Sequence, residues 1–383
     1  MTHSTKYQRY QRQIILEQFG TNAQEKLFQA KVLVVGAGGL GCPALQYLSA
    51  AGVGTIGIID FDVVELSNLQ RQTLYCTEDI GKPKAQTAAD KLKAFNPDIV
   101  FYVHHIKLDS KNALDLIRNY DVLIDGTDNF ATRYLVNDAS AILNKPLVYG
   151  AVLCFEGQVG VFNLADKITS TKTNYRDLFP VPPDPASAPS CNEAGVLGVL
   201  PGIIGTLQAT EAIKIITGIG KPLCNTIVSY NALTNLFYEF MIYPAKETDS
   251  SIPKNESAFR KFNYNWFCGS HEALNEITPA EFDDLRTREK IDIIDVRETN
   301  ELPLADEFSF IKIPLGKFGA AMKVISTKHK IVVFCQTGKR SLTAVKMLNE
   351  RFPGCAAVSL KGGIEAWKKY QLSVSTTPFN EQS

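Results

Sequence analysis

Short apolar runs alternate with amphipathic and polar stretches along most of the chain. Residues 31–35 and 55–59 are apolar and rich in β-branched side chains, and residues 120–128 contain a similar run. Runs of this length are typical of parallel strands that are buried on both faces of a sheet. Residues 84–96, which lie between them, have the composition of a helix. The pattern therefore predicts strands and helices in alternation.

The same alternation continues further along the chain. Residues 147–163 predict two strands, residues 201–217 an apolar helix, and residues 225–242 further strands. Residues 166–193 have no periodicity and are rich in proline, so we expect a long loop that crosses over the sheet. Residues 244–275 are polar and interrupted by prolines, and we expect a linker there.

A second alternating pattern begins near residue 276. Residues 291–295 predict a strand with an acid at its end, and residues 330–341 predict a strand, a tight loop and the start of a helix. Residues 359–367 close the pattern. About 100 residues of alternating strands and helices predict a small doubly wound domain over residues 276–378.

A glycine-rich turn directly follows the first strand. It contains Gly36, Gly38, Gly39 and Gly41, and Asp60 ends the second strand nineteen residues after Gly41. This is the order of a nucleotide-binding unit, because glycines let backbone N–H groups approach a phosphate and the acid accepts from a ribose hydroxyl. The alternative is that the glycines serve only close packing of the helix.

Composition narrows the class of protein. The chain has 383 residues, which favours two domains, and its 40 basic residues balance 40 acidic residues. No excess charge attracts it to nucleic acid or to an anionic membrane. We expect no membrane span, because no unbroken run of 18 apolar residues occurs. Eight cysteines at irregular spacing indicate a reducing compartment, so a cytoplasmic location is expected.

The polar residues that follow the second strand suit a triphosphate. Arg71 and Lys84 are cations that can neutralise phosphates, and Asn68 offers a short hydrogen-bonding side chain. Asp128 and Asn129 follow another predicted strand, and ligands of open parallel sheets bind at such ends. Asp125 lies at the same end, where it either faces the ligand or caps the turn.

Two cysteines are candidates for sulfur chemistry. Cys335 lies in a loop that leads into a helix, so backbone N–H groups and the nearby Arg340 can lower the pKa of its thiol. Phosphatases on related folds use one more residue in a loop of this kind to surround a phosphate. By that resemblance, the four residues between Cys335 and Arg340 favour sulfur chemistry in this loop. The alternative is a buried structural cysteine. Cys191 lies in the proline-rich loop, either as a thiol that reaches the reaction or as an inert one.

These residues carry a resemblance to two known families. Residues 7–269 resemble the MoeB/ThiF family, bacterial relatives of the ubiquitin-activating enzymes, and residues 276–375 are similar to single-domain rhodaneses. The resemblance implies a Rossmann-like nucleotide-binding domain of the ubiquitin-activating type over residues 1–270, followed by a rhodanese domain. The segments that carry it are Arg9-Tyr-Gln-Arg12-Gln-Ile, the glycine turn, Asp60 to Asp62, Ser67 to Gln72, Gly81 to Lys84, Thr127 to Asn129, Cys191 to Gly198, Asp295 to Glu298, the Cys335 loop and Gly362 to Trp367.

The resemblance implies adenylation of the C-terminal Gly-Gly carboxylate of a small ubiquitin-fold sulfur carrier of the MoaD or ThiS type. ATP and Mg²⁺ are the implied cofactors, and molybdopterin or thiamin biosynthesis the implied pathways. Asp128 would hold Mg²⁺, and Arg12 would reach the site from a neighbouring subunit, which implies a homodimer. A Cys335 persulfide loaded by a sulfur donor would then deliver sulfur to make a thiocarboxylate. The residues implied at the nucleotide are Gly36, Gly38, Gly39, Gly41, Asp60, Asp62, Ser67, Asn68, Arg71, Lys84, Asp128 and Asn129.

The chain departs from the family pattern in two places. Many members bind a structural zinc ion through two Cys-x-x-Cys pairs, but residues 174–177 contain no cysteine and only Cys268 remains at the second place. One thiolate cannot form a tetrahedral site, so we predict no zinc. Residues 300–314 also lack the usual Gly-His-Ile-Pro stretch of rhodaneses, which bears on docking of the sulfur donor.

Two other functions stay open at this point. An NAD-dependent oxidoreductase would use the same glycine turn, but it leaves Arg71, Lys84 and Cys335 without a role. A non-enzymatic scaffold that binds the carrier through a degenerate site would account for the missing zinc ligands. Carrier-dependent release of pyrophosphate separates the adenylating enzyme from both alternatives.

Overall fold

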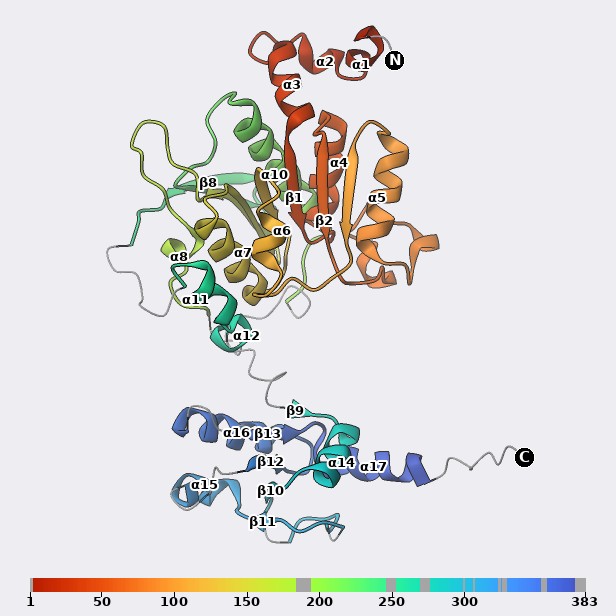
Figure 1. Cartoon of the computed structure of the whole chain (residues 1–383), viewed down its shortest axis with the longest axis vertical. Coiled ribbons are helices and arrows are strands. Elements are labelled where there is room, and N and C mark those ends of the chain that lie inside the picture. The colour runs from red at the N-terminus through yellow and green to blue at the C-terminus, as the bar shows by residue number, and fades with distance from the viewer. Residues whose placement is uncertain are drawn as a thin grey trace, which may run out of the picture. The chain divides into compact units, whose positions relative to one another are not determined.

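The chain folds into two compact units, residues Met1–Cys268 and Gly269–Ser383 (Figure 1). Each unit is described by itself. The computed structural model describes residues 3–183, 194–245, 253–268, 276–298, 300–305, 307–322, 325, 329–352 and 357–375.

An eight-stranded sheet forms the centre of the first unit, in the order β3-β2-β1-β4-β5-β6-β7-β8. Neighbouring strands are parallel from β3 to β5 and antiparallel from β5 to β8. The α/β fold expected from the sequence is confirmed. The strands are β1 (Lys31–Val35), β2 (Thr55–Ile59), β3 (Val100–His104), β4 (Val122–Asp125), β5 (Leu147–Leu153), β6 (Glu156–Phe162), β7 (Thr226–Asn231) and β8 (Leu236–Met241).

Helices connect and cover these strands. In the parallel half they follow the strands as the alternating pattern predicts, and a pair of 3-10 turns, η1 (Leu66–Asn68) and η2 (Thr77–Asp79), lies between β2 and α5. The helices are α1 (His3–Gln8), α2 (Gln11–Ile14), α3 (Gly20–Gln29), α4 (Gly41–Ala51), α5 (Lys84–Phe95), α6 (Ala113–Ile117), α7 (Phe130–Ile142), α8 (Tyr175–Leu178), α10 (Val199–Thr217), α11 (Glu256–Lys261) and α12 (Tyr264–Phe267).

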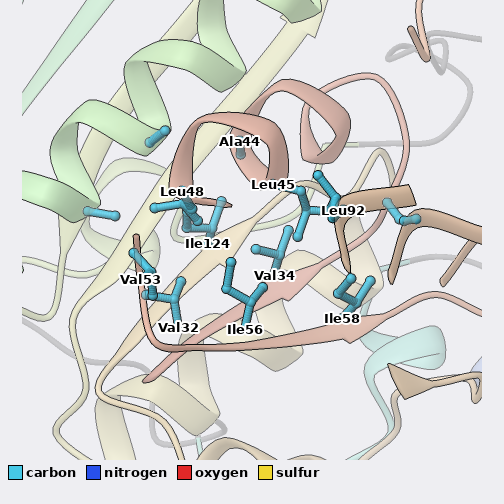
Figure 2. Close-up of a cluster of buried hydrophobic side chains, with 14 of the residues drawn as sticks. Val32, Val34, Ala44, Leu45, Leu48, Val53, Ile56, Ile58, Leu92 and Ile124 are labelled. Carbon is cyan, nitrogen blue, oxygen red and sulfur yellow. The ribbon is translucent and has the colours of Figure 1, made fainter. Parts of the chain in front are cut away.

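Alternate residues of the buried strands pack into cores on opposite faces of the sheet. Val32 and Val34 of β1 belong to the core that α4 and α5 cover, whereas Leu33 and Val35 belong to the core on the other face. Because both faces are covered, the strand is apolar at four consecutive positions. Figure 2 shows the first core, with labels on Val32, Val34, Ala44, Leu45, Leu48, Val53, Ile56, Ile58, Leu92 and Ile124.

Helix α10 is long and apolar enough to cross a membrane, judged by length and composition alone. The sequence prediction of no membrane span considered only unbroken apolar runs. It did not select this helix, because polar residues interrupt the apolar ones. It packs against α4, β5 and β6, and Gln208 and Glu211 are among its buried residues. These contacts assign α10 to the core of the layered domain.

Two segments contain structure that the periodicity did not predict. Helix α8 lies within the expected crossover loop, where its N-cap Asn174 accepts a hydrogen bond from the backbone N–H of Arg176. Helices α11 and α12 lie within the expected linker of residues 244–275 and pack against α7, with Phe259 fully buried. Helices of four to six residues are too short for a periodic pattern to identify.

The second unit has a parallel five-stranded sheet in the order β11-β10-β12-β13-β9. Its first helix begins with a capping box, in which Thr278 Oγ1 accepts from the N–H of Glu281 at 3.2 Å and Glu281 Oε2 accepts from the N–H of Thr278 at 2.8 Å. The elements are β9 (Glu276–Ile277), α14 (Pro279–Arg288), β10 (Ile291–Asp295), β11 (Ile311–Lys312), α15 (Leu315–Ala321), β12 (Lys330–Phe334), α16 (Lys339–Arg351), β13 (Ala357–Leu360) and α17 (Gly363–Ser375).

Candidate functional sites

The glycine turn between β1 and α4 has no room for larger residues at two positions. Gly36 adopts a φ of +92°, and a Cβ there would lie 2.8 Å from the carbonyl oxygen of Gly126. A Cβ on Gly41 would lie 1.9 Å from the carbonyl oxygen of Gly36. The turn therefore needs glycine both for its left-handed backbone and for close contact with the turn that follows β4.

A cavity of about 600 Å³ opens beside this turn, at the carboxyl ends of the parallel strands. This volume suits a nucleotide-sized ligand. The cavity brings together most of the residues that were predicted from the sequence to bind the nucleotide. Those that line it are Gly36, Gly38, Gly39, Asp60, Asp62, Arg71, Lys84, Asp128 and Asn129.

Gly41, Ser67 and Asn68 are not among the lining residues. Gly41 lies beneath the turn, where it serves packing. Asn68 is buried and its Oδ1 accepts from the backbone N–H of Glu65 at 3.2 Å, which closes the 3-10 turn η1. The backbone carbonyl of Ser67 accepts from Arg71 Nη1 at 3.1 Å. Ser67 and Asn68 thus shape the loop that presents Arg71 to the cavity.

Asp60 holds the glycine turn in place. Its Oδ2 accepts from the N–H of Ala37 at 2.8 Å, and its Oδ1 accepts from the N–H of Asp62 at 2.8 Å. Burial raises the pKa of the Asp60 carboxyl, and these two hydrogen bonds oppose the rise. Each carboxylate oxygen can accept a second hydrogen bond, so Asp60 can still accept from a ribose hydroxyl in the cavity.

Two cationic side chains line the cavity, and they differ in whether a carboxylate is paired with them. Lys84 is buried at the start of α5, and its Nζ lies 3.2 Å from Asp62 Oδ2. Arg71 pairs with no carboxylate among the described residues, and its guanidinium donates only to the Ser67 carbonyl there. A cation without a counter-ion at a nucleotide-sized cavity fits a polyphosphate, because the phosphates supply the missing charge.

The two acids after β4 have different surroundings. Asp125 is fully buried: its Oδ1 accepts from the N–H and the hydroxyl of Thr127 at 2.9 and 2.6 Å, and Arg133 Nε lies 3.3 Å from its Oδ2. Asp125 therefore organises the turn. Asp128 is exposed and lines the cavity, and Asn129 caps α7 by accepting from the N–H of Thr132 at 2.9 Å. A carboxylate at this edge of the sheet has the oxygen chemistry that Mg²⁺ prefers.

Sequence reasoning missed the inner wall of the cavity. Arg133 of α7 is buried and stacks over the ring of Tyr149, with 5.3 Å between the guanidinium carbon and the ring centroid. Tyr175 of α8 is 1% exposed. The Tyr175 hydroxyl and the Oε1 of Gln72 have no hydrogen-bond partner among the described residues. Tyr149 comes from strand β5, Arg133 from helix α7 and Tyr175 from helix α8 inside the expected loop, and no local pattern marks these positions as part of a cavity wall.

In the second unit, the loop after β12 curls around the Cys335 sulfur. Gly338 has a φ of +94°, and its N–H donates to the Sγ of Cys335 at 3.2 Å. The hydroxyl of Ser341 lies 3.5 Å from the same sulfur. Burial on its own raises the pKa of the Cys335 thiol, but hydrogen bonds from Ser341, Thr337 and Gly338 outweigh burial and lower the pKa below its ordinary value. The sulfur is therefore disposed to ionise and act as a nucleophile.

Arg340, in the first turn of α16 after this loop, is paired with a carboxylate. Its Nη1 and Nη2 each lie 2.5 Å from an oxygen of Glu301, and this pairing lowers the pKa of Glu301 to about 2. Cys335 is only 1% exposed, although its place in a loop between a strand and a helix suggests an exposed position. The cause is the start of α17, where Gly363 has no side chain and the N–H of Ile364 donates to the carbonyl of Cys335 at 2.9 Å.

The place where the family resemblance would put a zinc ion is filled by protein side chains. Residues 174–177 form the capping box of α8, and Arg176 donates from Nε and Nη2 to Asp138 at 2.8 and 2.7 Å. The Tyr264 hydroxyl donates to the same carboxylate at 2.8 Å. Burial raises the pKa of the Cys268 thiol to about 12, so it stays protonated. The described residues contain no group of three or more histidine, cysteine or acidic side chains that could hold a metal. This donor set does not fit zinc.

Two predicted residues are left without a structural test. Arg12 is exposed on α2 and is not among the residues that line the cavity of its own chain. Cys191 lies outside the described residues. The role of each stays a prediction.

Comparison with known families places the two units. A model of the ThiF family matches residues 10–252, and a model of the rhodanese-like domain matches residues 278–370. The solved structure of E. coli MccB with ATP has a TM-score of 0.54 and 21% identity, and covers 64% of this chain and 74% of that one. At this identity the likeness shows the fold alone.

Relatives of known name match over longer stretches. The probable adenylyltransferase/sulfurtransferase MoeZ of Mycobacterium tuberculosis is 43% identical over 371 residues, which are 94% of this chain and 92% of that protein. The sulfur carrier protein adenylyltransferase of Thermus thermophilus is 49% identical over 262 residues, 68% of this chain and 96% of that protein. The adenylyltransferase and sulfurtransferase MOCS3 of Drosophila grimshawi is 37% identical over 377 residues, 94% of this chain and 83% of that protein. The chain therefore belongs to the ThiF family and carries a rhodanese-like domain after its ThiF domain.

Proposed function

We propose that this chain is an ATP-dependent adenylyltransferase and sulfurtransferase that acts on a small ubiquitin-like sulfur carrier. The first unit joins the carrier's C-terminal carboxylate to AMP, and the second unit delivers the sulfur that replaces AMP. The observation that supports this most is the presence of both sites in one chain. One is a nucleotide-sized cavity lined by Arg71, which pairs with no carboxylate in the described part of the chain, and the other is a cysteine with a lowered pKa in a strand-to-helix loop. The near full-length likeness to a protein named for both activities agrees with it.

In the first step, a carboxylate oxygen of the carrier attacks the α-phosphorus of ATP and pyrophosphate leaves. This reaction needs no protein nucleophile, because positioning and charge stabilisation are sufficient. The glycine turn and Asp60 hold the adenosine end. Arg71 and Lys84 neutralise the charge that develops on the phosphates, and Lys84 exchanges its contact with Asp62 for the nucleotide.

Magnesium fits the acids at this edge of the sheet. Asp128 would hold the ion, which supplies further neutralisation of phosphate charge. Arg12 would enter the site from a second copy of the chain, so the active form would be a homodimer. We propose a cytoplasmic location, since the sulfur chemistry needs reduced thiols.

In the second step, the Cys335 thiolate takes sulfane sulfur from a donor such as thiosulfate and releases sulfite. The terminal sulfur of this persulfide attacks the carbonyl carbon of the acyl-adenylate, and AMP leaves. A thiol, from Cys191 or another source, then attacks the Cys335 sulfur of the acyl disulfide and releases the carrier thiocarboxylate. A thiol reductant reduces the disulfide that this attack leaves on Cys335 and so returns the thiolate. The hydrogen bonds from the loop to Sγ stabilise the thiolate that starts and ends this sequence.

The residues of the two sites argue against the two alternative functions. A nicotinamide oxidoreductase has no use for a cysteine of this kind, and a degenerate scaffold has no need of a cavity that retains Asp60, Arg71, Lys84 and Asp128. The pathway that the carrier serves, molybdopterin, thiamin or another, follows from the carrier's identity.

The decisive experiment incubates the full chain with ATP, Mg²⁺, thiosulfate and each candidate carrier. Pyrophosphate release that depends on the carrier is expected, together with a mass change of the carrier that corresponds to one sulfur in place of one oxygen. Absence of nucleotide turnover with every ubiquitin-like protein of the host would contradict the proposal. Tight NAD binding without ATP turnover would favour the oxidoreductase.

A further inference from the structure

A second serine lies behind the one that contacts the Cys335 sulfur. The Oγ of Ser341 is 3.5 Å from the Sγ of Cys335, 2.9 Å from the carbonyl oxygen of Gly338 and 2.8 Å from the Oγ of Ser359. Ser341 lies in the first turn of α16 and Ser359 lies on β13. Both side chains are fully buried, so no water competes for these contacts.

The hydroxyl protons of this cluster can be accounted for one by one. A serine has one proton to donate, and the Gly338 carbonyl and a Cys335 thiolate can only accept. Ser341 Oγ is the only hydrogen-bond partner that the described residues offer to Ser359 Oγ. A buried hydroxyl proton without an acceptor is costly, so Ser359 donates to Ser341. Ser341 then keeps its own proton for either the carbonyl or the sulfur.

We propose that Ser359 is a positioning residue for the sulfur chemistry, because it orients the Ser341 hydroxyl toward the Cys335 thiolate. A hydroxyl that accepts a hydrogen bond becomes a stronger donor. A charged sulfur attracts that donor more than a neutral carbonyl does, so ionisation of Cys335 turns the Ser341 proton from Gly338 to Sγ. The inference rests on the proposed role of Cys335 in sulfur transfer.

Other charged groups near the thiol are accounted for separately. Arg340 comes from α16 and is paired with Glu301 from the loop after β10, and its charge also acts on the Cys335 sulfur. Glu365 comes from α17 and accepts from Nε2 of Gln336 at 2.7 Å. At the end of β10, Asp295 and Arg297 are buried and pair with each other. None of these groups has Ser341 or Ser359 as a hydrogen-bond partner, so removal of a serine hydroxyl leaves their contacts in place.

The test is a double-mutant cycle on the full chain. Wild type, Ser341→Ala, Ser359→Ala and the double variant are alkylated with iodoacetamide across pH, and modification of the Cys335 peptide is followed by mass spectrometry. Ser341→Ala is expected to raise the pH midpoint by about one unit, and Ser359→Ala by a smaller amount. In the Ser341→Ala background, Ser359→Ala is expected to add no further shift, because its effect passes through Ser341.

Two further variants act as controls. Thr343→Ala removes an exposed hydroxyl from the same helix, and the midpoint is expected to stay at the wild-type value. Ser359→Thr keeps a hydroxyl at the position, so its pH midpoint is expected to lie close to the wild-type value. The inference is overturned if Ser359→Ala leaves the midpoint unchanged, or if it shifts the midpoint equally with and without Ser341. Alkylation needs neither ATP nor carrier, so a failure of the proposed carrier reaction leaves this result independent.

Discussion

The same local arrangement, a strand followed by a glycine-containing loop and a helix, forms an open site in the first unit and a closed site in the second. The loop after β1 has Gly36 at a φ of +92°, and the loop after β12 has Gly338 at +94°. Beside the first loop lies a cavity of about 600 Å³. The second loop encloses the sulfur of a residue that is 1% exposed.

The difference arises from the groups that each loop binds. In the first loop, the N–H of Ala37 donates to Asp60, which comes from the neighbouring strand, so the space above the glycines stays free. In the second loop, the N–H of Gly338 donates to a sulfur that belongs to the loop itself. The nearby arginines differ in the same way, because Arg71 has no carboxylate partner in the described part of the chain, whereas Arg340 is bound by Glu301. One site accommodates a nucleotide, and the other carries a single sulfur atom.

The largest expected effect comes from disabling each site in turn. Cys335→Ala is expected to abolish thiosulfate sulfurtransfer and to leave ATP–pyrophosphate exchange unchanged, because the thiolate acts only in the second chemistry. Asp128→Ala is expected to do the reverse. Both activities are measured on each variant, and loss of both activities in either one would show that the two sites are not separable.

Removal of the Arg71 guanidinium, which has no carboxylate partner among the described residues, is expected to have the next largest effect. Arg71→Ala takes away a donor that stabilises phosphate charge, so exchange is expected to fall by about 10²–10³-fold with sulfurtransfer unchanged. Arg118→Ala is the matched control, since Arg118 is exposed and pairs with Glu256 at 2.8 Å on the same unit. Equal activity of the two variants would remove Arg71 from the nucleotide site.

The buried ion pair of Arg176 and Asp138 lies next to Tyr175 of the cavity wall, and its removal tests how much it stabilises the first unit. Arg176→Met leaves the Asp138 carboxylate buried without its partner, which is expected to cost about 3–5 kcal/mol in the free energy of unfolding. Arg260→Met, which breaks an exposed pair with Asp115, is expected to leave the free energy of unfolding almost unchanged, because solvent screens the pair. Denaturant unfolding measures both.

Elemental analysis of wild type is expected to find no zinc, and one zinc per chain would contradict the assignment of this region to side-chain contacts alone.

The smallest expected effect concerns the ion pair of Glu301 and Arg340 beside the second site. Glu301 has an ordinary pKa of 4.5, which Arg340 lowers to about 2 in the folded chain. A lowered carboxyl pKa stabilises the fold above pH 4.5, and this contribution is lost as pH falls from 4.5 toward 2. Glu301→Gln is therefore expected to flatten the loss of stability of the second unit over that range, as followed by acid unfolding. An unchanged acid profile would show that the pair contributes nothing measurable.

Much of the fold and of the nucleotide site could be predicted from local sequence. The apolar runs of β1 and β2, the glycine turn and the position of Asp60 follow from local rules, and the cavity lies where those rules place it. Asn68 illustrates their limit, because its side chain serves the loop and not the cavity. Phe259 lies in a polar, proline-containing stretch that suggested a linker, yet it is buried against the helices of the first unit.

By itself the sequence determined which chemical groups occupy the strand ends and which loops need glycine, because backbone conformation and strand alternation depend on neighbouring residues. Only the tertiary structure decided which of those groups are already engaged. Asp125 and Asp128 are three residues apart, and one is buried in a turn while the other faces the cavity. Arg340 meets Glu301 across 39 residues, and Ser341 meets Ser359 across 18. Contacts of this kind form when distant segments pack, so no local pattern contains them.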